Sequence, residues 1–204
     1  MKAHPEDPEQ MSVIILAAGM SSRMGILKPF LKWDNHKTFL EKIIETYYSF
    51  SFEASQINLV LNPEGYKFIQ TELPEIAEYA EIFINDHPER GRFSSLKLGL
   101  QNLSKSSSCY IQNVDNPFVT DELLESMDKL TKPDSYVVPV YQGKGGHPVL
   151  IGANIITQLL SYDDTDHDLK DILVKFRKIE IETTDINILV NINSQEDYQK
   201  YFKH

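Results

Sequence analysis

The stretch Val13-Ile14-Ile15-Leu16-Ala17-Ala18-Gly19 decides the fold of this chain. A strand covered by helices on both faces forms an unbroken apolar run, and such strands are typical of the parallel sheets of α/β proteins. The small residues that follow predict a tight loop at the carboxyl end of this strand. Ligands of open α/β sheets bind at that end, so the loop is the first candidate for a binding site.

Short β-rich runs alternate with longer helical patterns along the rest of the chain. This alternation predicts a three-layer α/β/α architecture with a mostly parallel, Rossmann-like sheet and right-handed crossovers. The further strands are expected at 57–61, 82–84, 110–114, 136–140, 148–151, 179–181 and 188–190. The helices are expected at 38–50, 64–73, 94–103, 121–130, 154–160, 169–176 and 195–202. We expect residues 1–11, which are polar and contain two prolines, to form a flexible tail, and residues 12–204 to form a single domain.

Composition excludes several classes of function. The 204 residues hold 20 Lys and Arg against 30 Asp and Glu, a formal net charge of −10, so the basic surface that binds nucleic acid is missing. No run of about 18 apolar residues occurs, which argues against a membrane-spanning helix. The start of the chain lacks the apolar stretch of a secretory signal, so we expect a cytoplasmic protein. Cys109 is the single cysteine, which excludes a disulfide or a thiolate metal site within the chain.

The loop after the first strand carries residues suited to phosphate groups. Small residues from Leu16 to Gly19 let the backbone approach a phosphate and turn its N–H groups toward oxygen. Arg23 and Lys28 supply positive charge that can neutralise a triphosphate. The sequence is neither the Gly-x-Gly-x-x-Gly fingerprint nor a P-loop. From composition alone, a plain turn with two solvated cations explains the loop equally well.

Five motifs in order resemble the small nucleotidyltransferases that finish the molybdenum cofactor. They are Leu16-Ala17-Ala18-Gly19-x-Ser21-x-Arg23-Met24-Gly25 with Lys28-Pro29, Gly91-x-x-Ser94-Ser95-Leu96-x-x-Gly99-Leu100, Val114-Asp115-Asn116-Pro117, Gly146-His147-Pro148-Val149, and Asn191-Ile192-Asn193-Ser194-Gln195-Glu196-Asp197-Tyr198. The resemblance covers nearly the whole chain. It implies the fold of the nucleotide-diphospho-sugar transferases and the transfer of CMP or GMP from a triphosphate to molybdopterin. It also implies transient contact with a molybdoenzyme or its chaperone, although no residue here supports that contact.

Asp115 is the candidate metal ligand. It follows an apolar strand and precedes a turn, and Mg²⁺ needs only one or two carboxylates beside phosphate oxygens and water. The alternative is an Asx turn around Pro117. The resemblance implies a Mg²⁺ ligand, and it makes Arg23, Lys28 and Asp115 the expected catalytic residues. The amide oxygen of Asn191 is a weaker second candidate for the metal.

The resemblance also implies the residues that hold the two substrates. The backbone from Leu16 to Gly19, with Asn85, Arg92 and Ser95, is expected to bind the nucleotide, although Ser94 and Ser95 fit equally well as caps of the helix that begins there. Gly146 and His147 are expected to face the acceptor, but a lone histidine is as often a structural residue.

The choice of substrates depends on fewer residues. Ala18 stands where guanylyltransferases of the resembled families tend to have a second glycine, which favours CTP over GTP. The segment Asp163–Asp171 departs from the family pattern, and we expect a solvated acidic loop there rather than a metal site, since His167 has no second histidine at ligand spacing. Two other interpretations stay open, a sugar- or alcohol-phosphate nucleotidyltransferase and a non-catalytic nucleotide-binding protein.

Overall fold

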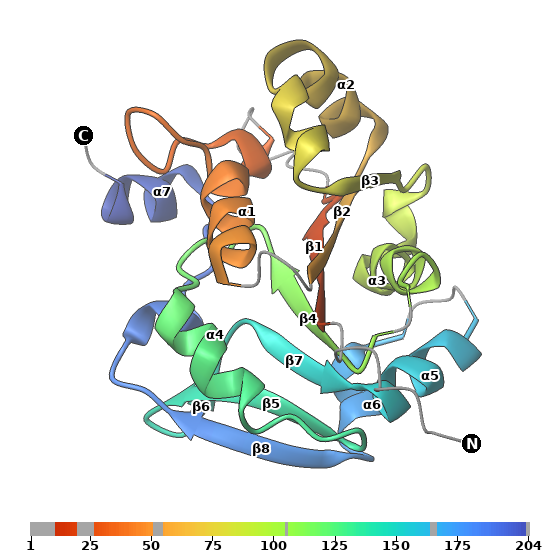
Figure 1. The fold of residues 1–204 in the computed structure, drawn as a ribbon. Helices are drawn as coiled ribbons and strands as arrows, with labels where there is room; N and C mark the ends of the chain where they lie inside the picture. The colour runs from red at the N-terminus through yellow and green to blue at the C-terminus, as the bar shows by residue number, and fades with distance from the viewer. Residues whose placement is uncertain (1–10, 20–26, 51–54, 105, 164–166, 203–204) are drawn as a thin grey trace, which may run out of the picture.

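One mixed sheet of eight strands forms the centre of the molecule (Figure 1). The computed structural model describes residues 11–19, 27–50, 55–104, 106–163 and 167–202. The strand order is β3-β2-β1-β4-β7-β5-β6, and β8 pairs with β5. The strands are β1 (Met11–Ala17), β2 (Ser55–Leu61), β3 (Glu81–Ile84), β4 (Ser108–Asn113), β5 (Ser135–Tyr141), β6 (Lys144–Gly145), β7 (Val149–Gly152) and β8 (Arg177–Glu182). The first four are mutually parallel and β7 is antiparallel to both its neighbours, so the predicted α/β fold with a mostly parallel sheet is confirmed.

Helices cover both faces of this sheet. One face packs against α1 (Phe39–Phe50), α2 (Pro63–Glu72) and α4 (Asp121–Asp128). The opposite face packs against α3 (Arg92–Gln101), α5 (Ala153–Ser161) and α6 (Leu169–Leu173). The remaining elements are α7 (Gln195–Tyr201) and the short 3₁₀ helices η1 (Lys28–Phe30), η2 (Pro74–Glu78), η3 (Pro88–Arg90) and η4 (Ile186–Leu189).

Strand β1 is apolar from Val13 to Ala17 because this part contributes to two cores. Successive side chains of a strand point to opposite faces. Val13, Ile15 and Ala17 therefore pack among the residues of α1, α2 and α4. Ile14 and Leu16 pack among those of α3, α5 and α6. Both cores close over the strand, which fixes the position of its carboxyl end and of the loop that follows.

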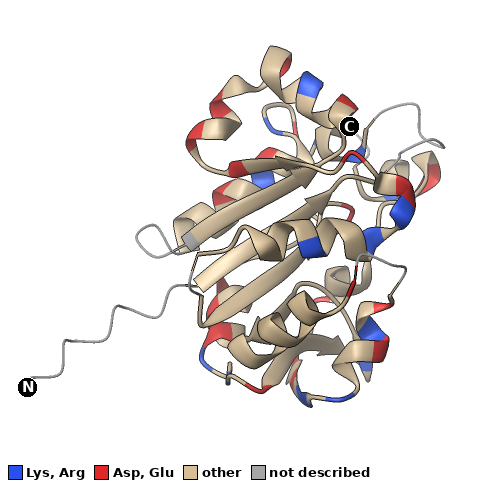
Figure 2. Cartoon of the chain, turned by 90° about the vertical axis from the view of Figure 1, so that its right-hand side faces the viewer, with Lys and Arg blue, Asp and Glu red and all other residues tan. Residues whose placement is uncertain are grey.

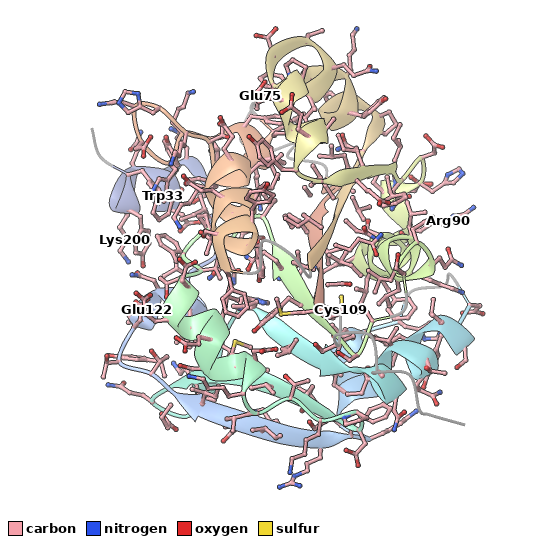
Figure 3. The ribbon with its side chains drawn as sticks, in the orientation of Figure 1. Trp33, Glu75, Arg90, Cys109, Glu122 and Lys200 are labelled. Carbon is pink, nitrogen blue, oxygen red and sulfur yellow. The ribbon has the colours of Figure 1, made fainter. Side chains whose placement is uncertain are left out.

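A third, aromatic cluster holds the C-terminal segment against the start of α1. The Trp33 ring lies 5.3 Å from that of Phe202 and 6.4 Å from that of Phe39. Trp33 lies beside α7 and α1 (Figure 3). The Tyr198 hydroxyl donates a hydrogen bond of 2.8 Å to the carbonyl of Lys32. The segment after η1 and the last helix are therefore packed and hydrogen-bonded to each other.

Charged residues lie on the helices, loops and outer strands, while β1, β4 and β7 carry none (Figure 2). Cys109 is buried in β4 near the middle of the molecule (Figure 3), and burial raises the pKa of its thiol well above the usual range. The thiol is therefore protonated and inert at neutral pH. Among the described residues, no helix has the length and apolar character needed to cross a membrane.

Three sequence predictions differ from the structure. The strand predicted at 188–190 is wrong, because residues 186–189 form η4, which the Asp185 carboxylate begins by accepting a hydrogen bond from the N–H of Asn187. The helix predicted at 169–176 ends at Leu173 and continues as a tight turn, since the N–H of Phe176 bonds the carbonyl of Leu173. Met11, which we assigned to the tail, is buried in β1, and the rest of that tail lies outside the described residues.

Candidate active site

A pocket of about 220 Å³ lies at the carboxyl ends of β1 and β4. These strands are parallel neighbours, so the residues that follow them meet at one edge of the sheet. The pocket is lined from β1 and its loop by Leu16, Ala17, Ala18 and Gly19, from the end of β4 by Asn113, Val114 and Asp115, and from other elements by Lys28, Pro29, Pro88, Gly91, Arg92, Ser95 and Asn193. The structure thus brings together most of the predicted nucleotide-binding residues. Arg23 lies outside the described residues.

Asp115 is the carboxylate of this pocket. It is only 9% exposed, and its Oδ1 atom is buried with no hydrogen-bond partner in the described part of the chain. Its Oδ2 atom lies 3.6 Å from the ammonium nitrogen of Lys28. A buried carboxylate oxygen is costly unless a donor or a cation satisfies it. Asp115 is therefore suited to receive a positively charged ligand.

Lys28 is held in the pocket by the chain around it. Pro29 occupies the first turn of η1, where its fixed φ angle suits the helix. Phe30 is buried and stacks on Phe68, with the ring centres 4.0 Å apart. The Lys28 ammonium nitrogen donates to the amide oxygen of Asn193 at 2.6 Å. Lys28 thus connects Asp115 to the C-terminal segment.

Asn193 is a site residue that we did not predict. The Asp197 carboxylate accepts hydrogen bonds from the N–H groups of Asn193 and Ser194, within a capping box that begins α7. The N–H of Ile192 donates to the carbonyl of Asp115 at 2.8 Å. Asn191, our second metal candidate, is exposed and does not line the pocket. The sequence did hold a signal for Asn193. The Ser194-x-x-Asp197 pattern predicts that a helix begins at Ser194, and Asn193 directly precedes that point.

The beginning of α3 faces the same pocket. Gly91 has a φ of 90°, a conformation that favours glycine, and no side chain caps the helix. The Ser94 hydroxyl donates to the carbonyl of Gly91, and the helix begins at Arg92, so the interpretation of Ser94 and Ser95 as caps is wrong. The unpaired N–H groups of a first helical turn attract anions. With Arg92 beside them, they favour a phosphate.

Asn85 acts in this structure as a support for the wall of the pocket. It is buried, and its amide nitrogen donates to the hydroxyls of Ser94 and Ser95 at 3.1 and 2.9 Å. Its amide oxygen accepts from the N–H of His87. Asn85 does not line the pocket, whereas Ser95 does.

His147 lies on the other side of Asn113. The amide nitrogen of Asn113 is 3.3 Å from both ring nitrogens of His147. Burial lowers the pKa of His147 from its ordinary value, and the negative charge of Asp115 only partly opposes this effect. The imidazole is therefore neutral at neutral pH. The preceding Gly146 packs on the backbone of Ile188, so closely that a Cβ atom would lie 2.5 Å from the carbonyl oxygen.

A second pocket, of about 560 Å³, lies between β4, α3 and α6 and includes His147. Leu16, Arg92 and Asn113 line both this second pocket and the first. The two pockets are therefore adjacent, with these residues between them. Two ligands can lie side by side, one in each pocket. Gly146 does not line either pocket.

The described residues contain no cluster of three or more His, Cys, Asp or Glu side chains that could hold a metal ion. The segment Asp163–Asp171 is described except at 164–166, and its His167 ring nitrogen lies 2.8 Å from the Asp163 carboxylate. Any metal in the first pocket would depend on Asp115 with oxygen atoms of Asn193, phosphate and water. Such a sparse, all-oxygen donor set suits Mg²⁺.

The fold and the pocket define a class, the α/β enzymes that bind a nucleotide at the carboxyl edge of a parallel sheet. The chain belongs to the family described as the MobA-like NTP transferase domain, whose model matches residues 13–179, and it is a nucleotidyltransferase. It is 27% identical over 188 residues to the "Molybdenum cofactor cytidylyltransferase" of Escherichia coli, covering 91% of this chain and 92% of that protein. It is 27% identical over 202 residues to the "Molybdenum cofactor guanylyltransferase" of Photobacterium profundum, covering 95% and 96%.

Solved structures support the fold. Rv0371c from Mycobacterium tuberculosis matches with a TM-score of 0.79 and 18% identity, over 96% of this chain and 98% of that one. The complex of Rv0371c with manganese matches with a TM-score of 0.75 and 15% identity, over 94% and 97%. The 4-diphosphocytidyl-2C-methyl-D-erythritol synthase of Anaerococcus prevotii matches with a TM-score of 0.73 and 16% identity, over 95% and 94%.

Proposed function

We propose that this nucleotidyltransferase transfers CMP from CTP to a phosphate oxygen of molybdopterin, or of a molybdopterin-like acceptor, and releases pyrophosphate. The observation that carries the proposal is the buried carboxylate oxygen of Asp115 beside Lys28, which has no hydrogen-bond partner among the described residues, in a pocket that the start of α3 also faces. The cytidylyltransferase of Escherichia coli supports the choice of CTP, as does Ala18. The guanylyltransferase relatives make GTP the alternative to test.

A divalent cation is part of this proposal. Asp115 and Asn193 offer a carboxylate and an amide oxygen in one pocket, which are hard donors of the kind that Mg²⁺ prefers. The manganese complex of the Mycobacterium tuberculosis protein supports a metal in this fold. When bound, the ion would neutralise charge on the triphosphate.

The residues of the chain align and neutralise the reacting phosphates. An oxygen of the acceptor phosphate forms a bond to the α-phosphorus, the bond from that phosphorus to the bridging oxygen breaks, and pyrophosphate leaves with the electron pair. Such in-line transfer needs positioning and charge neutralisation rather than a covalent nucleophile. Lys28 and Arg23 would neutralise the nucleotide phosphates, and Ser95 and the backbone from Leu16 to Gly19 would hold the nucleotide.

The second pocket would hold the acceptor. Neutral His147 can donate a hydrogen bond to an acceptor oxygen without adding charge, while its other nitrogen accepts from Asn113. Gly146 would help to position His147, because its lack of a side chain lets the backbone before His147 pack directly against Ile188. Arg92 lines both pockets, so its guanidinium can contact phosphate groups of both substrates.

We expect a rise in melting temperature with CTP and Mg²⁺ that exceeds the rises with GTP, UTP and ATP. A ligand at about 100 times its dissociation constant stabilises the folded protein by about 2.7 kcal/mol. The same protein, supplied with molybdopterin and CTP, should release pyrophosphate. A shift without Mg²⁺ dependence, or pyrophosphate release with GTP alone, would contradict the proposal in its present form.

A sugar- or alcohol-phosphate nucleotidyltransferase is the second candidate, favoured by the similarity to the methyl-erythritol synthase. A panel of phosphate acceptors, each incubated with CTP and Mg²⁺, separates the two candidates by pyrophosphate release. A non-catalytic protein would bind CTP but release no pyrophosphate with any acceptor in the panel.

Replacing Ala18 by glycine is expected to lower the preference for CTP over GTP by about tenfold, the scale on which a pocket discriminates one methyl group. Ala18 lines the first pocket, and its methyl group packs in the core formed with α3. This packing prevents the loop from moving away to make room for a larger purine base. The measurement is the ratio of kcat/KM for the two nucleotides. Ala17→Gly is the matched control, because the methyl group of Ala17 packs in the opposite core. An unchanged ratio in Ala18→Gly, or equal changes in both variants, would refute this role.

A further inference from the structure

The second pocket carries two cations that lack ion-pair partners. Arg92 begins α3, and Lys170 lies in the first turn of α6; both line the pocket. In the described part of the chain, neither side chain has a carboxylate within salt-bridge distance. Asp168 and Asp171 also line the pocket, and Asp168 accepts a hydrogen bond from the backbone N–H of Lys170 rather than from its ammonium group. Arg92 and Lys170 are therefore the groups of this pocket that can contact an anionic ligand.

Arg92 and Lys170 both lie near the buried side chain of His147. The positive charges of Arg92 and Lys170 both contribute to lowering the pKa of His147, so both lie close enough to the imidazole to influence it. His147 is itself next to Asn113, on the wall that the two pockets share. An anion placed between the cations would thus lie beside the first pocket.

Apart from the polar side chains of Asn113, His147, His167, Asp168 and Asp171, the rest of the second pocket is apolar. Its apolar lining includes Phe93 and Leu96 of α3 and Leu169 and Leu173 of α6. The His167 ring lies edge-on to Phe93, with centres 5.3 Å apart. A ligand with one anionic end and a flat, weakly polar body would fit, its anionic end at the two cations and its body against the apolar and aromatic side chains.

We propose that Lys170, together with Arg92, binds the phosphate of the acceptor and makes the enzyme select phosphomonoester acceptors over the corresponding alcohols. This inference rests on the proposed function, because it assigns the second pocket to the acceptor. Lys170 would hold the phosphate while one of its oxygens points toward the nucleotide past Arg92. Lys170 lies in the segment that departs from the family pattern, and no role was predicted for its side chain from the sequence.

The test uses inorganic phosphate as the probe. The full-length protein is first saturated with Mg²⁺ and α,β-methylene-CTP, which occupies the first pocket and cannot release pyrophosphate. Inorganic phosphate is then titrated by calorimetry. We expect Lys170→Gln to weaken phosphate binding by about tenfold, as expected for the loss of a charge-assisted hydrogen bond, and Lys170→Arg to retain it. Lys178→Gln is the matched control, since Lys178 lies on β8 and pairs with Glu180 outside the pocket.

Steady-state kinetics give the second readout. With molybdopterin as acceptor, Lys170→Gln should raise the KM for molybdopterin by about tenfold and leave the KM for the nucleotide unchanged. Equal phosphate affinity in Lys170→Gln and wild type, or no saturable phosphate binding by wild type, would overturn the role of Lys170. Either result leaves the proposed function standing if the CTP analogue binds. Failure of the analogue itself to bind would instead refute the proposed function, and this inference with it.

Discussion

Asp115→Asn is expected to lower the rate of nucleotidyl transfer by roughly a hundredfold to a thousandfold, the loss that follows removal of one group that stabilises charge in the transition state. The substitution keeps the size of the side chain but removes its negative charge. Asparagine also places an NH₂ group on one of two positions where the carboxylate offers oxygen to a cation. The affinity for CTP should become nearly independent of Mg²⁺. The measurements are single-turnover pyrophosphate release and CTP titrations with and without the metal.

The control for this variant is Asp134→Asn, which makes the same chemical change in the exposed turn before β5. It should retain the rate and the Mg²⁺ dependence of the wild type. The melting temperature of Asp115→Asn without ligands should stay close to that of the wild type, because Oδ1 has no partner to lose in the described chain and an amide oxygen can still face Lys28, which lies 3.6 Å from Oδ2. A variant that keeps both its rate and its response to Mg²⁺ would remove Asp115 from the mechanism.

The central strands could be predicted because their pattern has one physical cause. An apolar run such as Val13 to Leu16 fits a strand only if helices cover both faces, and the two cores around β1 show that they do. The antiparallel β7 could not be predicted in the same way. Its direction depends on the turn from Gln142 to Gly143, where the φ angles are 49° and 76°, and on pairing with β4, which is distant in sequence.

The predictions failed where long-range polar contacts outweigh local preference. Residues 188–190 are apolar and β-branched enough to predict a strand, yet their carbonyls bond to the buried amide of Asn116 instead of a neighbouring strand. The residues around 188–190 do not by themselves indicate that these carbonyls bond to Asn116 rather than to a strand. The contact joins residues more than 70 positions apart.

In the site too, residues marked by a local sequence pattern could be predicted, and residues defined by long-range contacts could not. Lys28 and Asp115 could be singled out from the sequence because each follows a strand or loop of recognisable pattern, and the structure places them 3.6 Å apart. Asn193 was missed in favour of Asn191, because both flank the buried Ile192 and the sequence offers the same side-chain chemistry at each. The structure separates them, because Asn193 lines the pocket and accepts a hydrogen bond from Lys28, whereas Asn191 does not line it.

Asn116→Ala is expected to reduce the free energy of unfolding by about 2 kcal/mol, because it leaves the carbonyl of Val190 without a donor among the described residues. The carbonyls of Asn187 and Ile188 each lose one donor but keep the N–H groups of Val190 and His147. Asn116 is 1% exposed, and its amide nitrogen lies 3.0, 3.3 and 2.5 Å from the carbonyl oxygens of Asn187, Ile188 and Val190. These residues form η4 and the chain that leads to Asn193. The measurement is urea denaturation, with the slope compared to confirm that the unfolded state is unchanged.

The matched control is Asn102→Ala, which removes an exposed amide that donates to a single helical carbonyl, that of Leu98. Water can replace that donor, so the cost should stay below about 0.5 kcal/mol. Asn116→Ala should also raise the KM for CTP at temperatures where the variant is fully folded. The variant loses the hydrogen bonds between the turn after β4 and the segment that places Asn193 beside Lys28. Equal destabilisation by the two variants would mean that Asn116 is no more than an ordinary surface amide. A strong loss of stability with an unchanged KM would limit Asn116 to the fold and separate it from the position of Lys28.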